Sequence, residues 1–266
     1  MKFRLLLLFC SLLILSSCKS DDNSDTTDDT AEDFKAENRK ALGLSARDIL
    51  SSGTYPKMVV EFVYSEGFRP RQETLDFFSD FLDERVFKPG GITFTETVID
   101  PPPGAPYNSQ EIRDIEDANR TLYTTDDTIA IYVFFSNGSA FGDTQTGFTL
   151  GSAYQNTSMV VYEKTLRDIA LNNTDFDLGA LEDTTLRHEF GHILGLVNIQ
   201  QDDIHDTHED LDNLKHDLLD TCLMFFQAQS ANNRMIEHMM AVSRSKNQGP
   251  QLDERCIEDL QSKGGK

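Results

Sequence analysis

Apolar positions recur along the chain with two periods, and each period predicts a different secondary structure. Runs rich in β-branched and aromatic residues predict strands at residues 57–64, 92–99, 128–135, 149–154 and 158–162. The run at 128–135 is apolar throughout, which is typical of a central strand buried on both faces. Apolar residues three or four positions apart predict helices at residues 72–87, 109–120, 231–244 and 252–260.

Another helix is predicted around residues 185–195, which read T-L-R-H-E-F-G-H-I-L-G. In a helix, His188 and His192 lie one turn apart on the same face, so their imidazoles can share one metal ion. Glu189 can then reach a water molecule at that ion. The opposite face carries the apolar residues Leu186, Phe190, Ile193 and Val197.

The ends of this helix are predicted from residues that favour helix termini. We expect the helix to begin near Leu181, with Asp183 or Thr184 as its N-cap. Gly195 follows His192 by three residues and permits the positive φ of a sharp turn. The helix should therefore stop at this glycine.

Composition limits the classes of function to consider. The 266 residues include 24 Lys and Arg against 45 Asp and Glu, a net charge of −21. Nucleic-acid binding relies on basic patches, so we expect no nucleic-acid partner. Hydrophobic residues make up 38% of the chain and include 18 Phe, which is enough for a real core.

Residues 1–17 have the pattern of a secretion signal. Two basic residues precede an apolar run at residues 5–15, which is too short to span a bilayer comfortably. The following Leu-Ser-Ser-Cys resembles a bacterial lipobox, which implies cleavage before Cys18 and its lipidation. Lys19 follows, so the aspartate associated with inner-membrane retention is absent. We expect an outer-membrane lipoprotein, and the acidic residues after Cys18 are similar to the export tags of surface lipoproteins.

Residues 18–44 are predicted to be a flexible acidic tether. Between residues 20 and 40 the chain is mostly Asp, Ser, Thr and Glu, with little that could be buried. We therefore divide the chain into a signal peptide at residues 1–17, this tether, and one folded domain at residues 45–266.

Two motifs and the order of the predicted elements resemble the metzincin superfamily of zinc metalloproteases. The first motif is H-E-x-x-H-x-x-G at residues 188–195, and the second is C-L-M at residues 222–224, which resembles the methionine turn with Met224 beneath the metal. Residues 216–224 also resemble the H-C-x4-C-x-M of archaemetzincins, with Asp217 in place of the first cysteine. The resemblance implies an α+β, zincin-like fold: a mixed, twisted sheet of about five strands, an active-site helix and a C-terminal helical subdomain.

The third zinc ligand cannot follow the usual metzincin spacing. That spacing leads to Asn198, and a neutral amide is a poor zinc ligand. The polar residues 200–215 resemble an insertion that returns the chain at His216, eight residues before Met224. We therefore predict one catalytic zinc ion with the ligands His188, His192 and His216.

Three alternatives to His216 remain open. His208 and His205 lie within the insertion, and His208 is the next candidate. Glu209 would be the third ligand of a glutamate-ligated zinc peptidase. The CxxC pair that helps archaemetzincins hold a second zinc is absent, so we expect a single ion.

The resemblance implies a zinc-dependent metalloendopeptidase that acts on peptide or protein substrates. Zinc would activate a water molecule, and Glu189 would be the general base. Metzincins bind the substrate as an additional strand at a sheet edge. We assign one segment of this chain to that edge, and the alternative is that the segment is an ordinary interior strand. The candidate edge residues are Gly151, Ser152, Ala153 and Tyr154. We expect a monomer that contacts the membrane through the lipid on Cys18.

Other classes of function remain open beside the peptidase. Asn198 at the usual ligand position motivates a surface lipoprotein that binds zinc or peptides without catalysis. A structural lipoprotein with an accidental motif is the third class.

Cys222 and Cys256 are the thiols that remain, besides Cys18, after removal of the signal peptide. An exported domain permits a disulfide between them, which would contribute about 3–4 kcal/mol. Two buried free cysteines are the alternative, since Cys256 lies on an apolar helix stripe.

Overall fold

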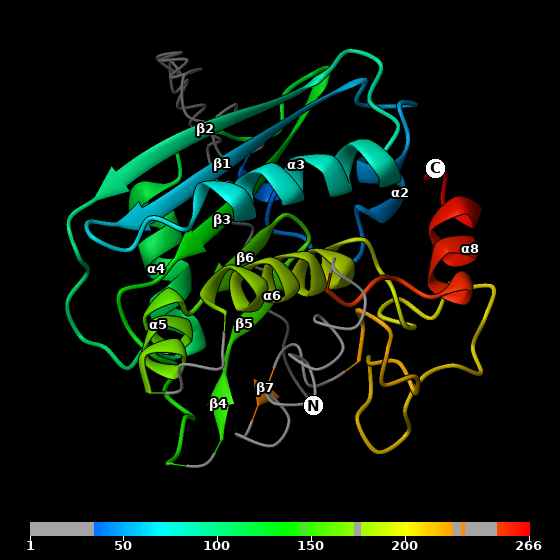
Figure 1. The fold of residues 1–266 in the computed structure, drawn as a ribbon. Coiled ribbons are helices and arrows are strands. Elements are labelled where there is room, and N and C mark those ends of the chain that lie inside the picture. Colours follow the sequence, from blue (N-terminus) through cyan, green and yellow to red (C-terminus); the bar gives the residue numbers. More distant parts are fainter. Residues whose placement is uncertain (1–34, 146, 173–176, 226–229, 232–248) are drawn as a thin grey trace, which may run out of the picture.

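The fold is built on a mixed five-stranded sheet with the strand order β2-β1-β3-β6-β5 (Figure 1). The computed structural model describes residues 35–145, 147–172, 177–225, 230–231 and 249–266. Four strands are parallel to their neighbours and β5 is antiparallel to β6. The strands are β1 (Lys57–Ser65), β2 (Ile92–Ile99), β3 (Thr128–Phe135), β5 (Gly151–Gln155) and β6 (Ser158–Val161). The mixed sheet of about five strands is therefore confirmed, with the apolar β3 at its centre.

Helices cover both faces of the sheet (Figure 1). One face carries α3 (Gln72–Arg85), α5 (Glu163–Asn172) and α6 (Leu178–Ile193), and the other carries α4 (Ser109–Asn119). The short α2 (Ala46–Leu50) and α8 (Glu254–Ser262) lie at the end of the sheet where α6 finishes. Among the helices of the described residues, none has the length and apolar character needed to cross a membrane.

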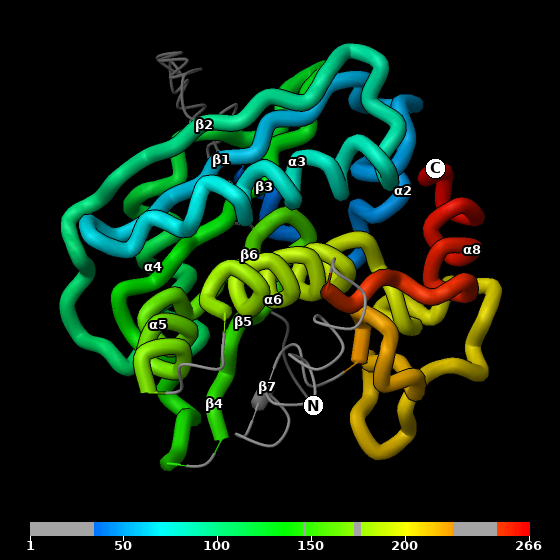
Figure 2. Tube along the Cα trace, in the orientation of Figure 1, coloured from blue at the N-terminus to red at the C-terminus, as the bar shows by residue number. Residues whose placement is uncertain are grey.

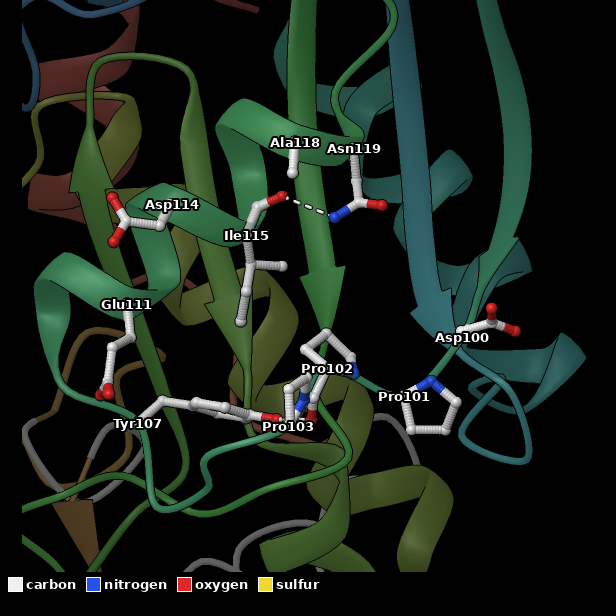
Figure 3. A pocket seen from close by; sticks show the side chains of 10 residues that line it. All are labelled: Asp100, Pro101, Pro102, Pro103, Tyr107, Glu111, Asp114, Ile115, Ala118 and Asn119. Atoms are coloured by element: carbon white, nitrogen blue, oxygen red, sulfur yellow. Dashed lines mark hydrogen bonds between the residues drawn. The ribbon is translucent and has the colours of Figure 1, made fainter.

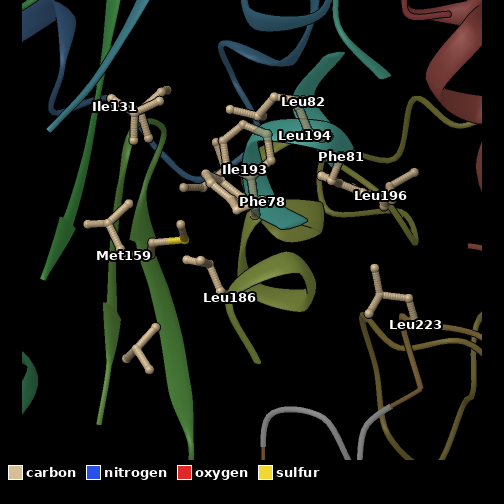
Figure 4. Packing of buried hydrophobic residues seen from close by; sticks show 14 of the residues in the cluster. Phe78, Phe81, Leu82, Ile131, Met159, Leu186, Ile193, Leu194, Leu196 and Leu223 are labelled. Atoms are coloured by element: carbon tan, nitrogen blue, oxygen red, sulfur yellow. The ribbon is translucent and has the colours of Figure 1, made fainter. Parts of the chain in front are cut away.

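Alternate residues of the central strand supply two cores. Ile131 and Val133 belong to the larger core beneath α3 and α6, whereas Tyr132 and Phe134 belong to the smaller core beneath α4. Figure 4 shows the larger core, in which side chains of α3 and α6 meet above the sheet. Each large apolar side chain buried there contributes about 1.5–3 kcal/mol. This packing fixes α6 against the sheet.

The local structure differs from the predictions in a split strand and in helices that were not predicted. The predicted strand at residues 149–154 is split, because β4 (Phe148–Thr149) pairs with β7 (Ser230–Ala231) in a separate two-stranded sheet. Helices α2 and α5 were not predicted. The predicted helix at residues 231–244 lies outside the described residues except for Ala231 in β7.

The start of α6 also corrects a prediction. The helix begins at Leu178, and the side chain of Asp177 caps it by accepting a hydrogen bond from Ala180 N at 3.0 Å. Asp183 and Thr184, the predicted caps, lie inside the helix and are buried. The predicted stop is observed, since Gly195 has a φ of 71°.

Part of the predicted tether belongs to the folded domain. Asn38 is fully buried, and its amide nitrogen donates to Thr124 Oγ1, Ala130 O and Thr157 Oγ1. Buried polar groups of this kind need such partners, so residues near Asn38 are tied to β3 and β6. The boundary at residue 44 is therefore too late in the sequence; residues 18–34, including Cys18, lie outside the described part.

Two buried carboxyl groups meet where α5 packs on α6. Burial, followed by the charge of Glu182, raises the pKa of Glu163 to about 9, although Arg167 opposes this shift. Glu182 accepts hydrogen bonds from Arg71 N at 2.9 Å and Thr74 Oγ1 at 2.6 Å. Glu163 therefore carries a proton at neutral pH in the folded protein.

This pair predicts a specific dependence of stability on pH. The folded pKa of Glu163 lies above the unfolded value of about 4.3, so its stabilising contribution is complete below that pH and is lost as pH rises towards 9. Glu163→Gln keeps a neutral group, so its free energy of unfolding should rise relative to wild type between about pH 5 and 9. Urea unfolding across this range measures the difference. The control is Asp168→Asn on the exposed side of α5, and parallel curves for Glu163→Gln and wild type would contradict the assignment.

Candidate functional site

The two histidines of α6 face each other in the protein interior. Their Nε2 atoms are 3.1 Å apart, and His188 and His192 are 0% and 3% exposed. His188 Nδ1 donates to the carbonyl oxygen of Leu223 at 2.8 Å, which leaves Nε2 without a proton and able to bind a cation. The carbonyl of Leu223, just before Met224, therefore orients the imidazole of His188.

His216 completes a group of three imidazoles. Its ring centroid lies 5.3 Å from that of His188 and 5.1 Å from that of His192, and one ligand atom of each ring lies within 4.8 Å of the others. His216 Nδ1 donates to Leu214 O at 3.0 Å. The structure thus brings the predicted third ligand to the α6 pair, from a segment 24 residues beyond His192 along the chain.

The alternatives to His216 as the third ligand lie outside the group of three imidazoles and make contacts elsewhere. Asn198 has a φ of 57°, its carbonyl accepts from Lys215 Nζ at 2.6 Å, and its backbone nitrogen donates to Asp203 at 2.7 Å. Glu209 Oε1 accepts from Lys215 N at 2.8 Å. His208 is buried between two aspartates.

The chemistry of the three imidazoles fits a zinc ion. Burial, followed by the charge of His216, lowers the pKa of His188 to about 3, and burial also lowers the pKa of His192. Neutral imidazole is the form that binds metal. Zinc–nitrogen bonds of about 2.0–2.1 Å in a tetrahedron separate ligand atoms by about 3.3–3.4 Å, close to the 3.1 Å between His188 and His192.

Glu189 lies beside this group and is held by the edge strand. Its Oε2 accepts from Ala153 N at 2.7 Å, while Oε1 is buried and has no hydrogen-bond partner among the described residues. Burial raises the pKa of Glu189 to about 8, and the hydrogen bond from Ala153 opposes this. A nearby cation would favour the charged form. The hydrogen bond from Ala153 N therefore fixes one oxygen of the Glu189 carboxyl group, and the other oxygen is available for a hydrogen bond.

The predicted substrate strand, Gly151 to Tyr154, lies within β5 at the sheet edge. Tyr162 N donates to Leu150 O at 2.9 Å, so by the alternation of an antiparallel pair Gly151 and Ala153 direct their backbone groups to the free side. A Cβ on Gly151 would lie 2.6 Å from Glu189 Cγ, so this close approach requires glycine. Tyr154 packs instead against the smaller core on the α4 side.

Met224 lies directly against the helix that carries the histidine pair. A Cβ on Gly191 would lie 2.3 Å from Met224 Sδ, so the thioether touches the backbone between His188 and His192. Met224 O also accepts from Asp217 N at 2.9 Å, which joins the turn to the His216 segment. Gly191 was not singled out from the sequence, although a glycine inside a helix is unfavourable and was the available signal.

The two cysteines are neighbours in the same region. The Sγ atoms of Cys222 and Cys256 are 4.0 Å apart, and both residues are buried free thiols in this structure. A disulfide requires about 2.05 Å between the sulfurs, so only a small movement separates the two states. The disulfide stays a prediction.

A surface pocket lies elsewhere, on the α4 side of the sheet (Figure 3). It is lined by the proline loop after β2 and by one side of α4, and the residues are Asp100, Pro101, Pro102, Pro103, Tyr107, Glu111, Asp114, Ile115, Ala118 and Asn119. It contains none of the predicted site residues, so the candidate chemistry belongs to the three-histidine group and Glu189.

Comparison with known proteins adds one similarity. No model of a protein family matches the sequence, and no curated protein matches it. Among solved structures, the chain is similar to archaemetzincin from Methanopyrus kandleri, with 16% identity and a TM-score of 0.49 over 78% of this chain and 96% of that one. Similarity at this level does not establish a shared family or activity, so the function proposed below depends on the arrangement of the residues.

The geometry of the three-histidine group leads to a prediction for the substitution of His216. His216→Ala should weaken zinc binding by more than about 100-fold, since changes in residues that only support ligands cost about 10–100-fold. Competition with a chromophoric chelator measures the affinity. The control is His205→Ala, at a partly exposed histidine of the insertion, and it should bind zinc as wild type does. Equal affinity of His216→Ala and wild type would remove His216 from the ligand set.

Proposed function

We propose that the protein is a zinc-dependent metalloendopeptidase. The observation that supports this most directly is the convergence of His188, His192 and His216, with ligand atoms within 4.8 Å of one another. Glu189 is on the same helix, and its carboxyl group is hydrogen-bonded to β5, the edge strand of the sheet that the described residues form. Three protein ligands leave one position of a tetrahedral zinc ion for water, which is the arrangement of catalytic rather than structural sites.

The residues divide the work of hydrolysis. His188, His192 and His216 would hold the ion, which supplies Lewis acidity towards a carbonyl oxygen and lowers the pKa of water. Glu189 takes the proton of the attacking water at its available oxygen and delivers it to the nitrogen of the leaving amine. Ala153 N holds the other carboxylate oxygen, so the base keeps its orientation through both proton transfers.

The substrate binds as an extended strand beside β5. The backbone groups of Gly151 and Ala153 on the free side can pair with a peptide, and such pairing recognises any sequence with an extended backbone. Because Ala153 N already donates to Glu189, the remaining donor and acceptors of this edge would carry the pairing. This arrangement brings a peptide backbone next to the base.

The base can be tested with an isosteric substitution. Glu189→Gln in the detergent-solubilised full chain should keep one zinc per molecule and lose hydrolysis of a peptide library by about 10²–10⁴-fold, the usual contribution of general acid–base catalysis. Glu209→Gln is the matched control and should remain active.

Each result has a distinct meaning. Substantial hydrolysis by Glu189→Gln would remove Glu189 as the base. Wild-type protein that binds zinc but cleaves nothing would favour the alternative of a zinc-binding or peptide-binding lipoprotein without catalysis.

We also propose that lipid on Cys18 anchors the protein to the outer membrane, which rests on the lipobox-like sequence alone. Cys18→Ser should abolish incorporation of labelled fatty acid and release the protein from outer-membrane fractions, because several acyl chains are needed for stable anchoring. Cys10→Ser, within the apolar run, is the control and should be lipidated normally. A Cys18→Ser protein that still incorporates the label and sediments with outer membranes would show that the lipobox interpretation is wrong.

A further inference from the structure

His208, in the insertion between α6 and Met224, is buried between two carboxylates from different parts of the chain. Its Nδ1 lies 2.9 Å from Asp217 Oδ2, and its Nε2 lies 3.2 Å from Asp259 Oδ2. The side chains of all three residues are at most 1% exposed. The imidazole therefore bridges the segment after His216 and helix α8.

Electrostatics favours a positive charge at this position. Buried carboxylates without compensation are costly, and a protonated imidazole carries a positive charge that can pair with both, through a hydrogen bond to Asp217 and an ion pair with Asp259. Burial lowers the pKa of His208, but the hydrogen bond to Asp217 and the charges of Asp217, Asp259 and Asp253 outweigh it, so the pKa is raised above its ordinary value.

One side of this bridge is directly connected to the third candidate ligand. Asp217 follows His216, and its backbone nitrogen donates to Met224 O at 2.9 Å. Leu218 N donates to His208 O at 2.9 Å, and Asp210 N donates to His216 O at 2.7 Å. Residues on both sides of His216 are thus hydrogen-bonded to the stretch that begins at His208.

The other side is connected to α8 and to the end of α6 (Figure 2). Asp259 Oδ1 accepts from Ile204 N at 2.9 Å and from His205 N at 3.0 Å. Lys263 Nζ, also from the C-terminal region, donates to Gly195 O at 2.7 Å. Helix α6, which carries His188 and His192, and the loop that carries His216 are therefore both held by the C-terminal region.

We propose that His208 is a positioning residue that clamps Asp217 to Asp259 and thereby holds His216 towards His188 and His192. This inference rests on the proposed zinc centre, in which His216 is the third ligand. His208 acts through the neighbouring chain and does not touch the ion.

A second metal ion is the competing explanation for the same cluster. Ligand atoms of His208, Asp217, Asp253 and Cys256 lie within 4.8 Å of one another. Two of the carboxylates are already engaged, since Asp253 Oδ1 accepts from Cys256 N at 2.8 Å and Asp217 Oδ1 accepts from Leu219 N at 2.7 Å. Nδ1 of His208 is hydrogen-bonded to Asp217 Oδ2 at 2.9 Å, and Nε2 lies 3.2 Å from Asp259 Oδ2 as an ion pair without hydrogen-bond geometry. A protonated imidazole pairs with both carboxylates in this arrangement, which favours the clamp.

The test compares zinc affinity and stoichiometry in the detergent-solubilised full chain. His208→Gln should weaken zinc binding by about 10–100-fold while the chain still binds one ion, as substitution of ligand-supporting residues does. His205→Gln is the matched control, because this partly exposed histidine on the same loop also pairs with α8, through Glu258. It should stay within about twofold of wild type.

A second pair of variants separates positioning from a general loss of structure. Asp259→Asn should weaken zinc binding like His208→Gln, and the double variant should be little worse than either, because both remove one interaction. Asp259→Glu keeps the carboxylate and should recover part of the affinity. These variants also decide the matter if His208→Gln does not fold.

Three outcomes would overturn the clamp. The first is wild-type affinity in a folded His208→Gln or Asp259→Asn protein. The second is additive losses in the double variant. The third is a wild-type content of two zinc ions that falls to one in His208→Gln, which would make His208 a ligand of a second ion. If His216→Ala also binds zinc as wild type does, the proposed zinc centre itself has failed, which the His208 variants alone would not show.

Discussion

Burial of α6 on every side is the constraint on which the site depends. From Leu181 to Ile193 each residue of the helix is buried, including the face that carries the histidines and Glu189. Polar groups inside a protein need partners, and on this face some of them come from separate segments: Leu223 O accepts from His188 Nδ1, Ala153 N donates to Glu189 Oε2, and the ring of His216 stacks on that of His188. The apolar face provides the energy of docking, and the polar face determines which segments must converge.

The support of the centre is distributed over residues that are distant in sequence. Met224 touches the backbone of Gly191, Asp217 joins the methionine turn to the His216 segment, and Lys263 reaches the turn at Gly195. Each of these contacts joins two of the four parts that surround the three histidines: α6 with its final turn, the His216 segment, the turn at Met224 and the C-terminal region. The relative positions of His188, His192 and His216 are therefore supported by the C-terminal region as well as by α6.

The sequence predicted the structure within single segments, but it predicted only some of the contacts between distant segments. The continuous apolar run of β3 predicted its central place, and Gly195 predicted the end of α6. His216 was placed with the pair because its spacing from Met224 resembled a known motif. The cap Asp177, the break at Leu150, the hydrogen bond from Ala153 to Glu189 and the contacts of His208 depend on backbone positions that no local pattern records.

The close approach of Glu189 to β5 limits how the chain can vary. Gly151 has no room for a side chain, and the amide of Ala153 is occupied by the carboxylate. Ser152 and Tyr154 point away from this contact on the alternate positions of the strand. In the proposed peptidase, substrate preference would therefore have to change through residues outside β5, most readily in the segment between α6 and Met224, where exposed leucines at positions 211, 214, 218 and 219 flank His216 in sequence.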